Sequence, residues 1–158
     1  MVENVWLQPH IIEWSQILLD SFERLLDYSL IARQGSKEEQ AESLFKANFV
    51  VVSHGIQADP ILNYGNQKAL DLWVTDWSTF VQTPSRLTAE PVNRKERAAM
   101  LEQAKRQGYI NNYRGVRIAS NGQKFYIDRA IIWNLTDSSS DKCGQAATFS
   151  QWEFIKSN

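Results

Sequence analysis

The sequence predicts a single α+β domain: a five-stranded antiparallel sheet with helices on one face, preceded by an N-terminal helical extension. Two helical patterns open the chain, and two short strand patterns follow them. After further helical segments, the last third of the chain has the pattern of β-strands. Helices and strands that are segregated in this way are typical of α+β domains, whereas a doubly wound sheet would alternate them.

The helical extension is predicted over residues 1–47, and the domain that contains the sheet over residues 48–158. Pro9 suits the first turn of a helix that extends to about residue 33, because the missing N–H of proline costs nothing there. A capping-box pattern at Ser36 opens a second, shorter helix. Apolar residues recur at helical spacing along the first helix, among them Leu18, Phe22 and Leu25.

The middle of the chain is predicted to contain two strands and three helices. Residues 49–54 are rich in β-branched side chains and end before a glycine, which predicts a buried strand. A turn leads from it into a short strand over residues 61–64. Of the helices that follow, Asn66 can cap the first, Trp77 lies in the second, and residues 93–107 form the third.

The last third is predicted to fold around a hairpin. Residues 110–119 and 123–134 flank Asn121-Gly122, a dipeptide that strongly favours a two-residue hairpin turn. With that turn, the two residue numbers in each cross-strand pair add up to 243. In this register the apolar face of the hairpin carries Phe125 and Trp133. The opposite, polar face carries Tyr113, Arg117 and Tyr126. A last strand is expected at about 145–155.

The same register places Arg114 opposite Arg129 on the apolar face of the sheet. Like charges that oppose each other across strands are unfavourable unless a negative group compensates them. That group is either an acidic side chain of the same chain or the carboxylate or phosphate of a ligand. In a third alternative, both guanidinium groups extend past the edge of the sheet into water.

Aromatic and apolar residues raise two further alternatives. Trp73 and Trp77 on the middle helices, with Phe125 and Trp133 on the sheet, either line an apolar ligand pocket or simply form the core. The apolar stripe of the first helix either covers the outer face of the sheet or pairs with a second subunit. In the second case, Leu18, Phe22 and Leu25 form the interface.

Charge and hydropathy exclude several classes of partner. Residues 1–79 carry 5 Lys/Arg and 11 Asp/Glu, a net of −6, whereas residues 80–158 carry 12 and 7, a net of +5. The two halves either neutralise each other, or the basic half holds an anionic ligand. An overall pI of about 6.1 is against a nucleic-acid partner. No apolar run approaches the ~18 residues of a spanning helix, and no leader pattern is visible, so we expect a cytoplasmic protein without a membrane partner.

The sequence contains no pattern that indicates catalysis or metal binding. His10 and His54 have no partners at ligand spacing. Cys143 lies in a polar turn without a neighbouring histidine that would activate it. Neither a nucleophile elbow nor a phosphate-binding loop is present. We therefore predict a protein that is not an enzyme, and the sequence identifies no cofactor.

Several short motifs together resemble the MEKHLA domain, a PAS-related family, from Val50 to Phe154. The literal string that names the family is absent, so the sequence is similar to the small stand-alone members of bacteria and cyanobacteria rather than to the plant members. The order of two strands, helices and three strands also resembles the PAS fold. The motifs are Val51-Val52-Ser53-His54-Gly55, residues 60–66, residues 115–118, residues 131–135 and residues 144–149.

The resemblance implies a regulatory domain that senses a small ligand or mediates dimerisation. The leading interpretation is a PAS-like sensory domain that binds a small, anionic ligand and signals through contacts with a partner protein or a second copy. The alternative is an interaction module that dimerises without a ligand. Flavin-adduct and haem chemistry are not implied, because Cys143 lies in a late turn and the middle helices contain no histidine. The expected ligand-binding residues are Arg114, Arg129, Trp73, Trp77, Phe125 and Trp133.

Overall fold

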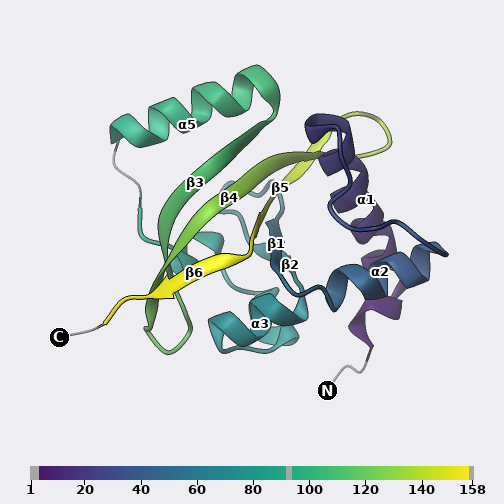
Figure 1. Cartoon of the computed structure of the whole chain (residues 1–158), viewed down its shortest axis with the longest axis horizontal. Helices are drawn as coiled ribbons and strands as arrows, with labels where there is room; N and C mark the ends of the chain where they lie inside the picture. Colours follow the sequence, from purple (N-terminus) through teal and green to yellow (C-terminus); the bar gives the residue numbers. More distant parts are fainter. Residues whose placement is uncertain (1–3, 92–93, 157–158) are drawn as a thin grey trace.

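The computed structural model describes residues 4–91 and 94–156, and it shows one antiparallel sheet with helices packed on both faces (Figure 1). None of the described helices is both long enough and apolar enough to cross a membrane. In chain order the elements are η1 (Val5–Leu7), α1 (Pro9–Leu26), α2 (Lys37–Phe45), β1 (Val50–His54), β2 (Leu62–Gly65), α3 (Gln67–Trp73), α4 (Trp77–Phe80), η2 (Ser85–Thr88), α5 (Arg94–Gln107), β3 (Tyr109–Ile118), β4 (Lys124–Thr136), β5 (Lys142–Phe149) and β6 (Gln151–Phe154).

The strand order β2-β1-β5-β4-β3 confirms the predicted α+β class, and every neighbouring pair is antiparallel. The last predicted strand is divided into β5 and β6, and both halves pair with β4. The partner numbers add up to 279 in both halves, as in Ile131 with Thr148 and Asp128 with Gln151. β5 and β6 therefore pair with β4 in the same register. The pairing is interrupted between them, at the point where Arg129 of β4 has a left-handed φ of 53°.

One face of the sheet is covered by α1, which extends along it on the right of Figure 1. The indole Nε1 of Trp14 donates to Ser53 Oγ at 2.9 Å, and that of Trp133 donates to the carbonyl of Leu18 at 3.3 Å. The ring of Phe22 packs edge-to-face on Trp133 at 5.0 Å. These contacts make the N-terminal helix part of the same hydrophobic core as the sheet.

The first helix is shorter than predicted, because it ends at Leu26 instead of residue 33. Asp27 has a left-handed φ of 62° and caps the helix, so the chain leaves the helical path there. Arg33 then returns to the side of α1, where its guanidinium pairs with Asp20 at 2.7 Å and with Glu23 at 3.1 Å. An ion-pair cluster therefore holds the loop that was predicted to be helix.

The other face of the sheet is covered by α3, α4 and η2. Trp73 at the end of α3 packs on Phe125 of β4 at 5.3 Å and on Phe149 of β5 at 6.1 Å. Phe80 at the end of α4 packs on Trp73 at 6.0 Å and closely approaches Gly65 of β2. A Cβ atom on Gly65 would lie 2.5 Å from Phe80 Cε2, so the packing requires glycine there.

The buried side chain of Asn66 connects α2, β1 and α3. Its Oδ1 accepts from the backbone N–H of Val51 at 3.1 Å and from that of Ala69 at 3.2 Å. Its Nδ2 donates to the carbonyls of Leu44 at 3.2 Å and Phe49 at 2.8 Å. The predicted N-cap of α3 is therefore confirmed, and the same amide also satisfies backbone groups of two other segments.

The β3–β4 hairpin has a register one residue away from the predicted one. Gly122 has a φ of 85° and its N–H donates to Ala119, whose own N–H donates to Gln123, so the loop contains three residues. Paired residues near the turn consequently add up to 242, as in Arg117 with Phe125. Because side chains alternate along a strand, this shift places Arg117 on the face that α3 covers, instead of the opposite face.

Two bulges interrupt the hairpin further from the turn. Gly115 pairs with Ile127 and Tyr113 with Ala130, so the single residue Arg114 faces both Asp128 and Arg129. Both arginines are exposed, and the guanidinium of Arg114 lies over the ring of Tyr126 at 4.4 Å. The prediction that Arg114 and Arg129 oppose each other on the core face is therefore wrong, because the turn and the bulge together place them in solvent.

We expect replacement of Asn66 by alanine to lower the free energy of unfolding by roughly 3 kcal/mol or more, because buried backbone groups lose their partners and α3 loses its cap. Urea unfolding followed by circular dichroism measures the change. Gln67→Ala is the matched control, since Gln67 is exposed and bonds only to Asp71 within α3. An equal effect of the two substitutions would contradict the conclusion that the buried hydrogen bonds of the Asn66 amide stabilise the fold.

Candidate functional site

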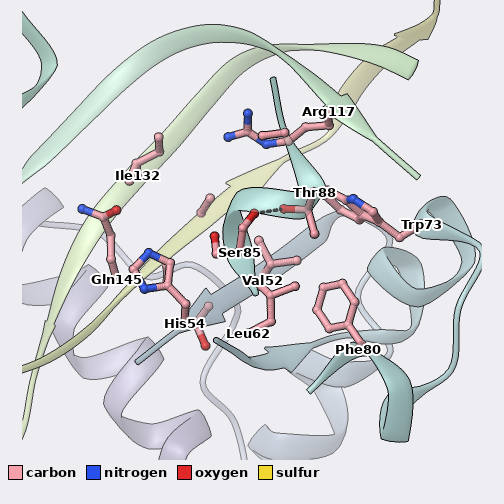
Figure 2. A pocket seen from close by; sticks show the side chains of 14 residues that line it. Val52, His54, Leu62, Trp73, Phe80, Ser85, Thr88, Arg117, Ile132 and Gln145 are labelled. Carbon is pink, nitrogen blue, oxygen red and sulfur yellow. Dashed lines mark hydrogen bonds between the residues drawn. The ribbon is translucent and has the colours of Figure 1, made fainter. Parts of the chain in front are cut away.

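A cavity of about 120 Å³ lies between the sheet and the segments that cover its α3 face (Figure 2). Its apolar wall is formed by side chains of β1, β2, α4 and β4: Val52, Leu62, Phe80 and Ile132. Its polar residues come from β1, η2, β3 and β5: His54, Thr88, Arg117 and Gln145. Trp73 closes the side next to α3. Elements from the whole length of the domain therefore contribute to one cavity, which is partly open to solvent.

The segment from Thr83 to Glu90, which we call the strap, connects the two edge strands of the sheet across this cavity. At one end, Leu62 of β2 donates to the carbonyl of Thr83 at 2.9 Å. At the other end, Ala89 pairs with Arg117, and the N–H of Glu90 donates to Val116 of β3 at 3.1 Å. Because β2 and β3 are opposite edges of the sheet, the strap covers the cavity from edge to edge.

Arg117 is a cation without an acidic partner in residues 4–91 and 94–156. Its guanidinium carbon lies 5.5 Å from the ring of Tyr113, and Nη1 donates to the carbonyl of Val116 at 3.4 Å. The carboxylate of Glu90, on the neighbouring strap, pairs instead with Lys124 Nζ at 2.7 Å. Most of the five N–H groups of this guanidinium therefore have no acceptor from the described chain.

Trp73, which also lines the cavity, carries a second unsatisfied donor. The side chain is only 4% exposed, and its Nε1–H has no hydrogen-bond acceptor among the described residues. The Tyr64 hydroxyl is also buried without a partner, and burial raises its pKa far above the ordinary value. Tyr64 does not line the cavity, however, because it packs against Trp77 behind β2.

The structure places one of the six expected ligand residues at the cavity and the others elsewhere. Trp73 lines it, and Phe125 lies directly behind Trp73. Trp77 packs between Phe45 and Tyr64, on the far side of α4. Trp133 belongs to the face that α1 covers, and Arg114 and Arg129 are exposed.

The expected interface residues of the first helix are occupied by contacts within the chain. Leu18 and Phe22 have no exposed surface, because they lie between α1 and the sheet. Leu25 is partly buried, and its Cδ2 would be 2.6 Å from a Cβ atom on Gly108. In this fold, therefore, Leu18 and Phe22 cannot contact a second subunit.

Sequence reasoning missed Arg117, because the two-residue turn assigned it to the polar outer face. The same Asn-Gly dipeptide also suits a three-residue loop with glycine in the left-handed position, and that alternative places Arg117 beside Phe125. His54 was expected to have no ligand partner, but its ring lines the cavity next to Gln145. Its Nδ1 donates to the carbonyl of Gly55 at 2.8 Å, and Nε2 makes no hydrogen bond within the described chain.

Cys143 lies at the beginning of β5, and it is not among the residues that line the cavity. Burial raises the pKa of its thiol, and the nearby negative charge of Asp137 raises it further. A thiol with a raised pKa contains little of the nucleophilic thiolate at neutral pH. Among the described residues, no group of histidine, cysteine, aspartate and glutamate side chains is suited to hold a metal ion.

The fold and its sequence pattern match known proteins. The sequence model of the MEKHLA domain matches residues 12–154. The chain belongs to the MEKHLA domain family. The match begins within α1, so the family pattern includes the helix that covers the outer face of the sheet.

A curated relative of this MEKHLA domain is the homeobox-leucine zipper protein ATHB-9 of Arabidopsis thaliana. The two are 24% identical over 98 residues, which are 62% of this chain and 12% of the relative. The chain therefore spans only a small part of the length of the relative that it matches.

Solved structures with the same fold include PAS and light-oxygen-voltage domains. A PAS domain from Colwellia psychrerythraea has a TM-score of 0.60 at 11% identity, with 75% of this chain and 95% of that chain covered. An RNA-binding light-oxygen-voltage receptor gives 0.59 at 16% identity, over 75% and 34% of the two chains. A light-oxygen-voltage domain studied with a flavin analogue gives 0.54 at 14% identity, over 75% and 85%. The predicted PAS-like fold is therefore confirmed.

We expect Cys143 to react slowly with iodoacetamide at pH 7, and Asp137→Asn to increase the rate roughly twofold or more, because the substitution removes a charge that disfavours the thiolate. Asparagine can retain the bonds that Asp137 Oδ1 accepts from Ser139 and Asp141. Asp141→Asn is the control in the same turn and should leave the rate unchanged. Alkylation followed by intact-mass spectrometry measures all three rates. Equal rates in the three proteins would contradict the conclusion that the charge of Asp137 raises the pKa of the Cys143 thiol.

Proposed function

We propose that this MEKHLA domain is a non-catalytic sensory domain that binds a small molecule in the cavity beneath the strap. The observation that carries the proposal is Arg117, a partly buried cation that lines the cavity and has no acidic partner in the described chain. A desolvated cation is unfavourable unless a negative group compensates it. A small anionic ligand would supply that group.

The size of the cavity limits the ligand. About 120 Å³ is well below the ~300–1,000 Å³ that is common for drug-sized ligands. A bulky tricyclic cofactor is larger than this volume. The proposed ligand is therefore a small metabolite rather than a large prosthetic group.

The strap offers a route by which ligand binding reaches the surface. Arg117 pairs with Ala89 at the end of the strap, and α5 begins a few residues further along the chain. A ligand that draws Arg117 into the cavity would change this pairing and with it the position of α5. We infer that the domain signals through such a change to a partner protein or to a second copy.

We expect freshly purified protein to carry a small additional mass in native mass spectrometry that is lost on denaturation. Arg117→Gln should abolish the additional mass, because it removes the charge that compensates the ligand. Arg114→Gln is the matched control, since Arg114 lies on the same strand but is exposed on the opposite face. It should keep the mass.

Retention of the mass by Arg117→Gln, or its loss from both variants, would contradict the proposed site. A bare dimer in the same spectrum would favour the alternative, an interaction module without a ligand. Because Leu18 and Phe22 are buried, such a dimer would have to use another surface.

A further inference from the structure

We infer that the ligand is a short-chain monocarboxylate, held with its carboxylate against Arg117 and the Trp73 indole and with its hydrocarbon part against the apolar wall. This inference rests on the proposed function and assigns a chemical class to the ligand of the same cavity. Four properties of the cavity lead to it: its unsatisfied donors, its single arginine, its volume and its apolar surface.

Two different side chains that line the cavity carry hydrogen-bond donors without an acceptor in the described chain. Arg117 carries a planar set of five N–H groups, and within the described chain one of them forms a hydrogen bond, from Nη1 to the carbonyl of Val116. Trp73 is more than nine-tenths buried, and its Nε1–H has no acceptor in residues 4–91 and 94–156. A carboxylate has two oxygens that accept several hydrogen bonds, so one group can satisfy a guanidinium and an indole together.

The charge of the lining residues favours one carboxylate over two. Arg117 is the only lysine or arginine among the residues that line the cavity in the described chain. One carboxylate neutralises it, whereas a second carboxylate would find no second lysine or arginine among these lining residues. No aspartate or glutamate is among the lining residues, so the ligand does not meet a repelling charge.

Volume and surface restrict the rest of the molecule. A cavity of about 150 Å³ is sufficient for benzene, so about 120 Å³ corresponds to a molecule of the size of propionate or butyrate. Val52, Leu62 and Phe80 provide apolar surface for a short hydrocarbon chain. Figure 2 shows these three side chains below Arg117 and Thr88, so a chain that extends downward from Arg117 would meet apolar surface.

The test follows the indole resonance of Trp73 in ¹⁵N-labelled protein, with the resonance assigned from its loss in Trp73→Phe. Propionate, propionamide, succinate and octanoate are added in separate titrations. We expect propionate to shift the Trp73 resonance saturably. Propionamide has the same shape without the charge, and it should bind at least about tenfold more weakly. Succinate and octanoate should also bind more weakly, because one carries a second charge and the other exceeds the volume.

Two variants connect the result to the named side chains. Arg117→Gln should abolish the shift by propionate, whereas Arg114→Gln should bind like the unsubstituted protein. Both arginines lie on β3 and neither is buried in the core, so both variants should fold. Their circular dichroism spectra and melting temperatures verify this before the titrations.

The outcomes separate this inference from the proposed function. Propionamide that binds as tightly as propionate would overturn the carboxylate assignment, while the cavity would still bind a small molecule. The assignment would also fail if native mass spectrometry identified a neutral or dicarboxylic ligand that depends on Arg117. If no compound shifted the Trp73 resonance and no bound mass were found, both proposals would fail.

Discussion

The fold depends on a buried amide, that of Asn66, which satisfies backbone groups at the end of one helix, in the first strand and at the start of another helix. The end of α2, the beginning of β1 and the first turn of α3 meet at this side chain. These backbone groups are largely shielded from water, and without the amide the N–H groups of Val51 and Ala69 would lose the partner that it provides. The amide also fixes where α3 begins, and thus where Trp73 at its other end meets the sheet. Local hydrogen bonding and the position of the cavity wall are therefore linked.

The second constraint is the register of the β3–β4 hairpin. Three residues in the loop, instead of two, place Arg117 and Phe125 on the same face, against α3 and the strap. The bulge at Asp128 and Arg129 adds one residue to β4, so the side chains beyond it exchange faces of the sheet. Ile132 consequently lines the cavity, and Trp133 faces α1. The chemistry of the cavity is thus a consequence of backbone geometry at Gly122 and Arg129.

Segment types and the overall class could be predicted from the sequence, because periodicity, caps and turn residues act locally. The capping box at Ser36 and the N-cap at Asn66 are examples.

The site could be predicted only in part. Trp73 was found because an aromatic residue at the end of a helix that faces the sheet is easy to recognise. Arg117 was missed because its face depends on the length of one loop, and both lengths suit Asn-Gly. The burial of Leu18 and Phe22 depends on which surface α1 covers, and an apolar stripe alone does not specify this.

The contact between Gly65 and Phe80 gives the cavity a simple means of evolutionary adjustment. Phe80 lies directly on the backbone of Gly65, so the position of its ring in the cavity wall depends on the absence of a side chain at that position. Within the same scaffold, a larger residue at position 65 would be accommodated only if the ring were displaced. A smaller residue at position 80 would enlarge the volume without any change to the hydrogen-bond donors. The volume of the cavity and its positive charge are therefore determined by separate residues, and related domains could change one of these properties while they keep the other.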